Sequence, residues 1–282
     1  MKVLVTGVGG QLGYDVIKEL TKRGIDCIRA DLQEFDITDY EAAHSFITAH
    51  KPDAIIHCSA YTAVDKAEDE PELCHRVNAL GTENIAKICK EINAKMVYIS
   101  TDYVFPGAGE DFYEVDSATS PQNIYGRTKL AGEIAVVDLL DKYFIVRSSW
   151  VFGINGSNFV KTMLKLGKEH SKINVVADQI GSPTCTADLA PLLCDMVATE
   201  KYGTYHATNE GICSWAEFAE AIFKIAKIDC KVNLIKTEDY PTRAVRPKNS
   251  RMSKKSLDAI GLKRLPSWQD ALERYCKELE YK

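Results

Sequence analysis

The sequence predicts an α/β fold, a doubly wound parallel sheet followed by a smaller carboxyl-terminal lobe. Short apolar, β-branched runs alternate with longer helical patterns through the first half, and the first run leads directly into a glycine-rich turn. After about residue 150 the alternation loosens. Nearly continuous apolar strands are typical of a sheet buried on both faces, and strands that alternate with helices pair in parallel. We expect one domain in residues 1–150 and a lobe formed mainly by residues 151–282, with some later elements returning to the main sheet.

The candidate elements follow in chain order. In the first half, strands are expected at 2–5, 26–30, 53–59, 95–100 and 143–148, and helices at 12–23, 40–50, 73–92 and 123–140. In the second half, helices are expected at 159–168, 187–199, 215–228 and 267–279, and short strands at 173–176, 204–207 and 232–235. The Pro-rich, basic stretch 240–251 is expected to be a loop. In such sheets, ligands bind beyond the carboxyl ends of the strands.

The composition excludes several classes of protein. Of the 282 residues, 45% are hydrophobic and 27% are charged, which is ordinary for a soluble globular chain. The formal net charge of −5 argues against a nucleic-acid binder. No apolar run reaches the ~18 residues of a membrane span, and the chain opens on a strand-like run without a signal-peptide layout. We expect neither nucleic acid nor a membrane as a partner.

The nine cysteines indicate the compartment. Their number is odd, no two have C-x-x-C spacing, and most lie inside apolar runs. A disulfide framework and a metal cluster are both disfavoured by this pattern, and no cluster of carboxylates or histidines defines another metal site. Buried, reduced thiols predict a cytoplasmic protein.

The turn after the first strand carries the first functional signal. Gly7, Gly10 and Gly13 stand in the segment GVGGQLG, between a predicted strand and a predicted helix. In this context one glycine permits the tight turn, another lets backbone N–H groups approach a pyrophosphate, and the last lets helix and sheet pack closely. The helix amino terminus adds unpaired N–H donors and a positive dipole end. The turn predicts a Rossmann-like dinucleotide-binding domain in residues 1–150.

An acid at the end of the second strand bears on the choice of cofactor. Asp31 lies 18 residues after Gly13, close to the ~20 expected for the carboxylate that binds the adenosine ribose. Such a carboxylate favours NADH over NADPH because it repels a 2′-phosphate, although the nearby Arg29 could soften that preference. Further contacts are expected where the chain passes the adenine and the middle of the cofactor, at Asp36, Ile37, Ala60, Tyr61 and Thr62. For Asp36, an ordinary acid at a helix start is the alternative.

A tyrosine and a lysine with the spacing Y-x-x-x-K lie within a later helical pattern. Tyr125 and Lys129 are four residues apart, so they share a helix face and can reach one site. A carbonyl that receives hydride gains negative charge on its oxygen, and a tyrosine can protonate it if a nearby ammonium lowers the phenol pKa from ~10. A second match, Tyr14 and Lys18, lies behind the phosphate turn at the wrong end of the cofactor, so position favours the first pair.

The polar end of the strand at 95–100 supplies a third group. A hydroxyl at the carboxyl end of a strand can donate a hydrogen bond to a substrate carbonyl oxygen. Ser100 and Thr101 are the candidates, and we favour Thr101. The alternative for this Ser-Thr-Asp segment is local turn and cap chemistry.

Together these motifs make the chain similar to the extended short-chain dehydrogenase/reductase superfamily, and within it to the dTDP-4-dehydrorhamnose reductases. The similarity runs nearly end to end, and its more specific segments are 61–68 (YTAVDKAE), 178–184 (DQIGSPT) and 246–251 (RPKNSR). The resemblance implies that NADH or NADPH reduces the C4 ketone of dTDP-4-dehydro-L-rhamnose to dTDP-L-rhamnose, with the proton from Tyr125. It implies a catalytic set of Thr101, Tyr125 and Lys129.

The resemblance also implies the remaining contacts. Cofactor contacts are implied at Gly7, Gly10, Gln11, Leu12, Gly13, Asp31, Asp36, Ile37, Ala60, Tyr61, Thr62, Tyr125 and Lys129. Substrate contacts are implied at Thr101, Asp102, Trp150, Arg246 and Arg251, with the basic loop meeting the substrate diphosphate. The alternatives are core packing for Trp150 and surface charge for the arginines. Some members of the family are associated with a divalent metal, and several form homodimers. Whether this chain does either is not decided by its sequence.

Two other functions share these motifs. A nucleotide-sugar 4-epimerase or dehydratase has the same glycine turn and Tyr–Lys pair, but holds its NAD tightly. A non-catalytic regulatory subunit, like the beta subunit of methionine adenosyltransferase, resembles the same family. Net consumption of NADH or NADPH separates the reductase from both.

Overall fold

A six-stranded parallel sheet lies at the centre of the computed structural model, which describes residues 1–280. Its order is β10-β5-β4-β3-β1-β2, and every neighbouring pair is parallel. The strands are β1 (Lys2–Thr6), β2 (Asp26–Ala30), β3 (Ala54–His57), β4 (Lys95–Thr101), β5 (Tyr143–Ser148) and β10 (Gly203–His206). The chain moves outward from β1 to β2 and then crosses back to β3, so the order reverses between β1 and β3, where folds of this type bind ligands. The doubly wound α/β fold is confirmed.

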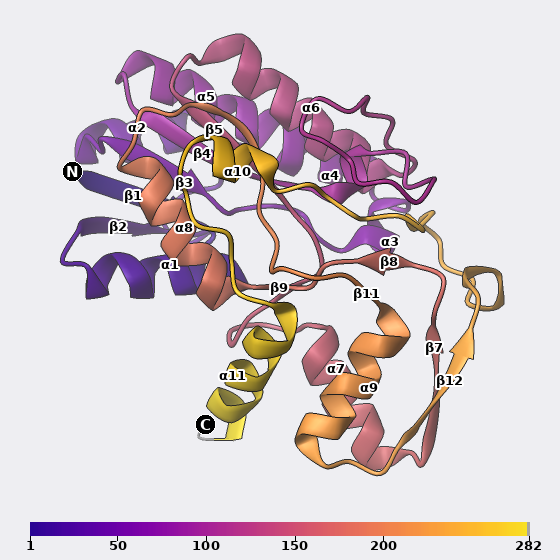
Figure 1. Cartoon of the computed structure of the whole chain (residues 1–282). Coiled ribbons are helices and arrows are strands. Elements are labelled where there is room, and N and C mark those ends of the chain that lie inside the picture. The colour runs from indigo at the N-terminus through magenta and orange to yellow at the C-terminus, as the bar shows by residue number, and fades with distance from the viewer. Residues whose placement is uncertain (281–282) are drawn as a thin grey trace.

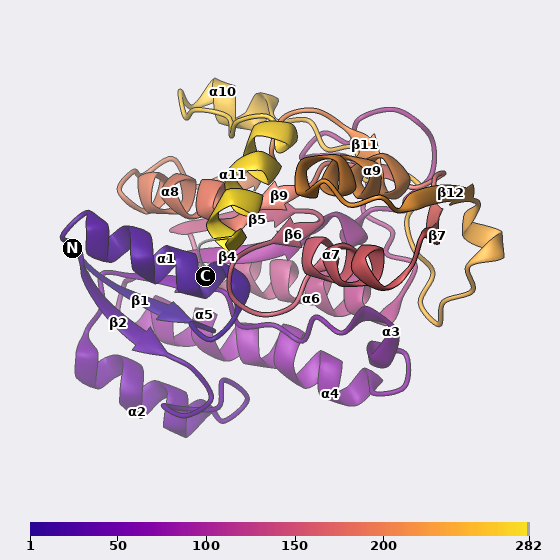
Figure 2. The ribbon, with the colours of Figure 1, turned by 90° about the horizontal axis from the view of Figure 1, so that it is seen from below.

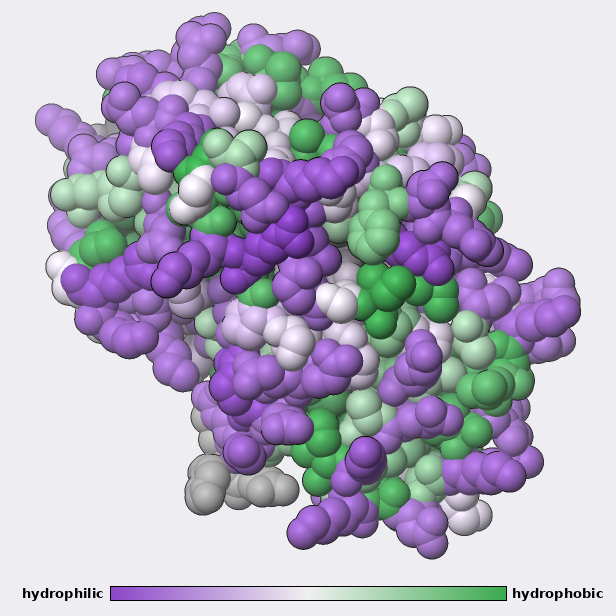
Figure 3. Space-filling model, in the orientation of Figure 1, coloured by the Kyte–Doolittle hydropathy of each residue, from purple (hydrophilic) through white to green (hydrophobic). Residues whose placement is uncertain are grey.

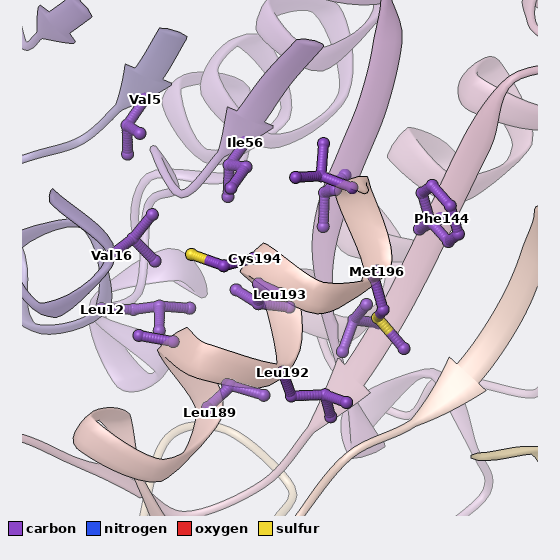
Figure 4. Close-up of a cluster of buried hydrophobic side chains, with 14 of the residues drawn as sticks. Val5, Leu12, Val16, Ile56, Phe144, Leu189, Leu192, Leu193, Cys194 and Met196 are labelled. Atoms are coloured by element: carbon purple, nitrogen blue, oxygen red, sulfur yellow. The ribbon is translucent and has the colours of Figure 1, made fainter. Parts of the chain in front are cut away.

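Helices cover both faces of the sheet (Figures 1 and 2). The helices on one face are α1 (Gln11–Lys22) and α8 (Thr186–Val197), and those on the other are α2 (Tyr40–His50), α5 (Thr82–Glu91) and α6 (Ile124–Leu139). Figure 4 shows the first interface, where Leu193 and Met196 of α8 lie among strand residues such as Ile56 and Phe144. Burying a side chain of this size contributes about 1.5–3 kcal/mol. Because both faces are covered, the central strands have nearly continuous apolar sequences.

The helix expected at 73–92 is interrupted. The structure divides it into α4 (Pro71–His75), a π-helical turn η1 (Arg76–Gly81) and α5. Asn78, in the π-helical turn, is 1% exposed, and its side chain bonds the backbone of Tyr61 and the hydroxyl of Thr128. The expectation of one continuous helix is therefore wrong at its centre, where a buried amide is turned toward neighbouring segments. Such π-helical turns are frequent near functional sites.

The second lobe has its own apolar core. Helices α7 (Phe159–Glu169) and α9 (Trp215–Ala226) pack with the parallel pair β7 (Lys172–Val176) and β12 (Lys231–Ile235), and α11 (Trp268–Glu280) adds to the cluster. The sequence analysis missed several short elements, which are α3 (Val64–Ala67), η2 (Asp102–Val104), β6 (Val151–Phe152), β8 (Ile180–Gly181), β9 (Thr184–Cys185), β11 (Cys213–Ser214), η3 (Thr237–Asp239) and α10 (Lys255–Ala259). Elements of two to five residues are too short to show a periodicity.

The two parts of the chain are interleaved. β10 and α8 come from beyond residue 150 but belong to the main sheet layer. The assignment of 1–150 to the cofactor and of 151–282 to the substrate stays a prediction, and residues 281–282 lie outside the described residues. The face in Figure 3 is largely hydrophilic with small, separate hydrophobic patches. Within residues 1–280, no helix combines the length and the apolar character that crossing a membrane requires.

A buried ion pair joins α6 to the sheet. The Arg147 guanidinium on β5 donates two hydrogen bonds to Glu133 on α6, from Nε to Oε1 at 2.9 Å and from Nη2 to Oε2 at 2.7 Å. Ser100 donates a third bond to the same carboxylate at 2.5 Å. Bidentate pairs of this kind have strong, well-defined geometry. Both side chains are buried, so the loss of one partner leaves an uncompensated charge in the interior.

We predict that Arg147→Met lowers the free energy of unfolding by about 3–5 kcal/mol, because Glu133 stays buried without its cation. The double variant Glu133→Leu/Arg147→Met removes both charges and should recover most of that loss. Urea denaturation of the two variants and the wild type at neutral pH measures the difference. A double variant as unstable as the single one would contradict the electrostatic cause.

Candidate active site

The glycine turn between β1 and α1 has the shape that the sequence predicts. Gly7 has φ +68°, and a Cβ built on it would lie 2.8 Å from the backbone nitrogen of Ser59 after β3. A Cβ on Gly13 would overlap the carbonyl oxygen of Gly7. Any side chain at these positions would push α1 away from the strands. The turn therefore leaves a cradle of backbone groups at the helix amino terminus that fits the pyrophosphate of a dinucleotide.

A cavity of about 650 Å³ adjoins this turn. Its lining combines the turn with the residues that follow β2 and β3, and includes the predicted cofactor residues Gly7, Gly10, Asp31, Asp36, Ile37, Ala60 and Tyr61. Gln11 instead accepts hydrogen bonds from the backbone of Gly153 (2.9 Å) and the amide of Asn158 (3.0 Å), and Leu12 belongs to the core under the sheet. Gly13 and Thr62 are not part of the lining.

Asp31 contacts the glycine turn directly. Its Oδ2 accepts a hydrogen bond from the backbone N–H of Gly9 at 2.6 Å, and its Oδ1 accepts one from Leu32 at 2.9 Å. Arg29 lines a second hollow, which shares Gly9, Asp31 and Leu32 with the first. An acid and a base are thus both available near the place where the adenosine ribose is expected.

Asn78 is a site residue that the sequence analysis missed. Its Oδ1 accepts a hydrogen bond from the N–H of Tyr61 at 2.7 Å, and its Nδ2 donates to the carbonyl of Tyr61 at 3.1 Å and to Thr128 on α6 at 3.2 Å. One amide thereby ties the backbone along the cavity to the helix that carries Tyr125. The available signal was a lone amide inside the apolar run 77–80.

Helix α6 docks closely on the end of β4. Asn123 caps the helix by accepting a hydrogen bond from Gly126 at 2.8 Å. A Cβ on Gly126 would overlap the carbonyl oxygen of Tyr103, and one on Gly132 would overlap the hydroxyl of Tyr98. These two glycines let the helix backbone approach the strand, which brings Tyr125 next to the residues at the carboxyl end of β4.

Tyr125 is paired with Thr101 in this arrangement. Burial raises the pKa of Tyr125 above its usual value, and a hydrogen bond with the Thr101 side chain acts in the opposite direction. The ring of Tyr103 meets the Tyr125 ring edge-on, with centroids 5.5 Å apart. The neighbouring carboxyl group of Asp102 also favours the protonated phenol. Tyr125 is therefore kept as a proton donor in the ligand-free protein.

Lys129 is the buried cation of the site. It is 2% exposed, and its Nζ lies 4.2 Å from the centre of the Tyr98 ring. Burial lowers the pKa of Lys129 to about 7, and the nearby carboxylate of Glu133 opposes that shift. After burial, the groups that most change the pKa of Tyr125 are Thr101, which lowers it, and Asp102, which raises it. That Lys129 lowers the pKa of Tyr125 stays a prediction.

The predicted substrate residues come from both lobes. Trp150 follows β5 with φ +50° and stacks on Trp215 at 3.7 Å between ring centroids. Arg246 donates to Asp65 on α3 at 2.6 Å and to the hydroxyl of Tyr103 at 3.2 Å, so it lies one ring away from Tyr125. Arg251 instead donates to Asn249 within its own loop at 2.9 Å, and no hydrogen bond or ion pair found among residues 1–280 joins its side chain to the catalytic set.

No cluster that could hold a metal ion is present in the part of the chain that the structure describes. His57, which the sequence left without a role, bonds Thr6 on β1 (2.8 Å) and Thr82 on α5 (3.3 Å). Burial and the charge of Lys129 lower the pKa of His57 to about 3. It therefore stays neutral at physiological pH and ties two elements together.

The fold and the site together define an extended short-chain dehydrogenase/reductase. The parallel sheet reverses order beside a glycine turn, and a Tyr–Lys pair lies on the helix after β4. A family model described as RmlD substrate binding domain matches residues 1–281. The chain belongs to this family.

Individual relatives agree with that assignment. The dTDP-4-dehydrorhamnose reductase of Mycolicibacterium smegmatis is 41% identical over 276 residues, which cover 96% of this chain and 84% of the relative. A solved dTDP-4-dehydrorhamnose reductase from Clostridium acetobutylicum has a TM-score of 0.97 at 42% identity and covers 99% of this chain and 100% of its own. That of Bacillus anthracis, solved in complex with NADP, has a TM-score of 0.96 at 45% identity, with 98% and 99% covered. The resemblance drawn from the sequence is confirmed.

We predict that Lys129 makes stability depend on pH. Its pKa is lower in the folded protein than in the unfolded chain, so between about pH 7 and pH 10 the unfolded state binds more protons and the free energy of unfolding rises with pH. Relative to Lys129→Met, the wild type should gain about 3–4 kcal/mol across this window. Denaturant unfolding at both ends of the window measures the gain, with Lys165→Met on the exposed face of α7 as the control. An equal pH dependence in wild type and Lys129→Met would refute the buried-cation assignment.

Proposed function

We propose that this protein uses NADH or NADPH to reduce the C4 ketone of dTDP-4-dehydro-L-rhamnose, giving dTDP-L-rhamnose. The observation that carries the proposal is the placement of Thr101, Tyr125 and Lys129 at the carboxyl edge of the sheet. It is supported by relatives named dTDP-4-dehydrorhamnose reductase that are about 40% identical over nearly the whole chain.

The proposed reaction needs little movement of the side chains. When bound, the reduced nicotinamide supplies the hydride. Thr101 and Tyr125 present two hydroxyls to the carbonyl oxygen, which polarises the carbonyl and orients the carbon. Tyr125 gives its proton to the oxygen as negative charge develops there. The ammonium of Lys129 on the same helix face then favours the phenolate that remains.

We propose a preference for NADH on the basis of Asp31. Its carboxylate lies beside the expected ribose and repels the 2′-phosphate of NADPH. Arg29 lines the adjoining hollow and can accept that phosphate, so the preference is expected to be moderate. The related Bacillus anthracis structure was solved with NADP, which agrees with a site that tolerates both.

The nucleotide-sugar substrate is expected to meet Arg246, whose guanidinium contacts the hydroxyl of Tyr103. In the ligand-free protein this guanidinium is paired with Asp65, and the neighbouring Arg243 is paired with Asp69. A diphosphate offers the same bidentate oxygens as a carboxylate with more charge. Substrate binding therefore exchanges Asp65 for phosphate at Arg246.

We also infer that the enzyme works in the reducing cytoplasm, since none of the nine cysteines, all of which lie within residues 1–280, forms a disulfide and seven of them are buried. The nucleotide sugar is its partner in this proposal. A homodimer and a divalent metal stay expectations from the family resemblance alone.

Tyr125→Phe is the test of the chemical step. We expect it to bind NADH about as tightly as the wild type, because the ring keeps its packing against Tyr103. Turnover should fall by about 100-fold or more, because the phenolic proton is lost. The readout is the absorbance of NADH in the presence of dTDP-4-dehydro-L-rhamnose, compared with a panel of other keto-sugars. Wild-type turnover in this variant would show that the proton comes from elsewhere, and a wild-type protein that never consumes NADH would sink the proposed function.

Arg246→Gln tests the diphosphate contact. We expect the affinity for dTDP to fall by about 10-fold, which corresponds to the loss of one charge-assisted pair, while the affinity for NADH stays the same. Calorimetric titration with dTDP measures this, with Arg264→Gln as the control because Arg264 pairs with Asp258 on a different surface. Equal dTDP affinity in Arg246→Gln and wild type would place the diphosphate elsewhere.

A further inference from the structure

Asp102 is a buried carboxyl group without a basic partner. It is 2% exposed, and none of the ion pairs found among residues 1–280 includes it. This sets it apart from Glu133, which is equally buried but neutralised by Arg147. An unpaired carboxylate in the interior is costly, so a group of this kind either stays protonated or serves a function.

Two hydroxyl groups hold Asp102 in place. Ser250 donates a hydrogen bond to its Oδ2 at 2.5 Å, and Thr101 donates to its Oδ1 at 3.0 Å. Ser250 belongs to the basic loop of the second lobe, whereas Thr101 ends β4. The carboxyl group therefore lies between the end of β4 and the basic loop, next to Thr101. The substrate contact that the family resemblance implied for Asp102 stays a prediction.

Thr101 connects Asp102 to the predicted proton donor. Its hydroxyl bonds the Asp102 carboxyl group, and its side chain is the hydrogen-bonding group that lowers the pKa of the Tyr125 phenol. The four side chains therefore lie in series, from Ser250 through Asp102 and Thr101 to Tyr125. Lys129 does not belong to this series, since its ammonium lies over the ring of Tyr98.

We propose that Asp102 returns a proton to Tyr125 through the hydroxyl of Thr101 after each reduction. This inference rests on the proposed function. Hydride addition breaks the carbonyl π bond, and the oxygen takes the phenolic proton of Tyr125. When Asp102 is protonated, its Oδ1 hydroxyl donates to Thr101, the reverse of the bond to the carboxylate, and the Thr101 proton is free to turn toward Tyr125. The phenolate then takes the Thr101 proton while Thr101 takes the proton of Asp102, so that only the carboxylate is left charged. Asp102 regains a proton from water between turnovers, and one proton is consumed for each ketone reduced.

The surroundings suit Asp102 to this role. Burial raises the pKa of Asp102 to about 6, against the opposing hydrogen bonds from Ser250 and Thr101. An acid with that pKa can protonate a tyrosinate and still exchange protons near neutral pH. The titratable groups around it are the phenols of Tyr103 on η2 and Tyr125 on α6.

Two further charges stand behind the Tyr103 phenol. Arg246 from the basic loop contacts its hydroxyl, and Asp65 on α3 pairs with Arg246. The groups that set the pKa of Asp102 are nearer. Burial raises it, and the hydroxyls of Ser250 and Thr101 and the backbone N–H groups of Asp102 and Tyr103 lower it.

The first experiment needs no cofactor and no turnover. In ligand-free protein labelled with ¹³C at the aspartate carboxyl carbons, NMR should show one carboxyl group that titrates near pH 6. The signal should be missing in Asp102→Asn. It should move to higher pH in Ser250→Ala, because a hydrogen bond that favours the carboxylate is lost. Ser253→Ala, in the same loop, is the control and should leave it unmoved. An Asp102 signal that titrates in the usual acidic range, or one unmoved in Ser250→Ala, would overturn the proposal.

The second experiment separates the relay from the proposed function. In the wild type, kcat should fall as pH rises through the inflection seen by NMR, because Asp102 loses the proton that it would pass to Tyr125. Asp102→Asn should lower kcat by about 10-fold or more and remove that inflection, whereas Ser250→Ala should shift it upward; the NADH dissociation constant should stay unchanged in both. Reduction by Asp102→Asn with the wild-type pH profile would refute the relay alone. A wild type without any ketone reduction would refute the proposed function instead.

Discussion

The site depends on the close approach of helix α6 to the carboxyl end of β4. Gly126 and Gly132 have no side chain to separate the helix from Tyr103 and Tyr98, and the buried pair of Glu133 and Arg147 fastens the middle of the helix to the sheet. Tyr125 and Lys129 lie within this fastened stretch. Because the helix is rigid, anchoring its first turns and its middle fixes both side chains relative to the strand ends.

The same arrangement places several polar groups where water is excluded. The ammonium of Lys129, the carboxyl of Asp102 and the phenol of Tyr125 all have pKa values displaced by burial. Each displacement disfavours the charged form and therefore costs stability, which the apolar interfaces on both faces of the sheet offset. The groups that are fully neutralised, such as Glu133, are those that hold the scaffold. The groups that form no ion pair among the described residues are those that face the proposed chemistry.

Local signals in the sequence were sufficient for most of the main sheet and for the helix that carries Tyr125 and Lys129. Apolar runs and glycine spacing predicted β1 to β5, the turn and the helix of Tyr125, since these depend on residues close together in the chain. The π-helical turn was not predicted, because in the sequence Asn78 cannot be told apart from any other polar residue of a helix. Its partners, Tyr61 and Thr128, lie on other segments. The pairs Asp102–Ser250 and Asp65–Arg246 join residues 148 and 181 positions apart, and no periodicity reports such contacts. The family resemblance implied a substrate contact at Arg251. In the ligand-free protein its guanidinium bonds Asn249, and the contact with the substrate stays a prediction.

The central claim is that this edge of the sheet delivers hydride to the ketone carbon of a nucleotide-linked sugar. The most direct measurement uses NADH with deuterium at the transferred position and dTDP-4-dehydro-L-rhamnose, followed by NMR of the sugar product. The account predicts a single deuterium at C4 of the sugar, with one NADH oxidised for each sugar formed. Deuterium at another carbon, or product formed without net oxidation of NADH, would contradict it.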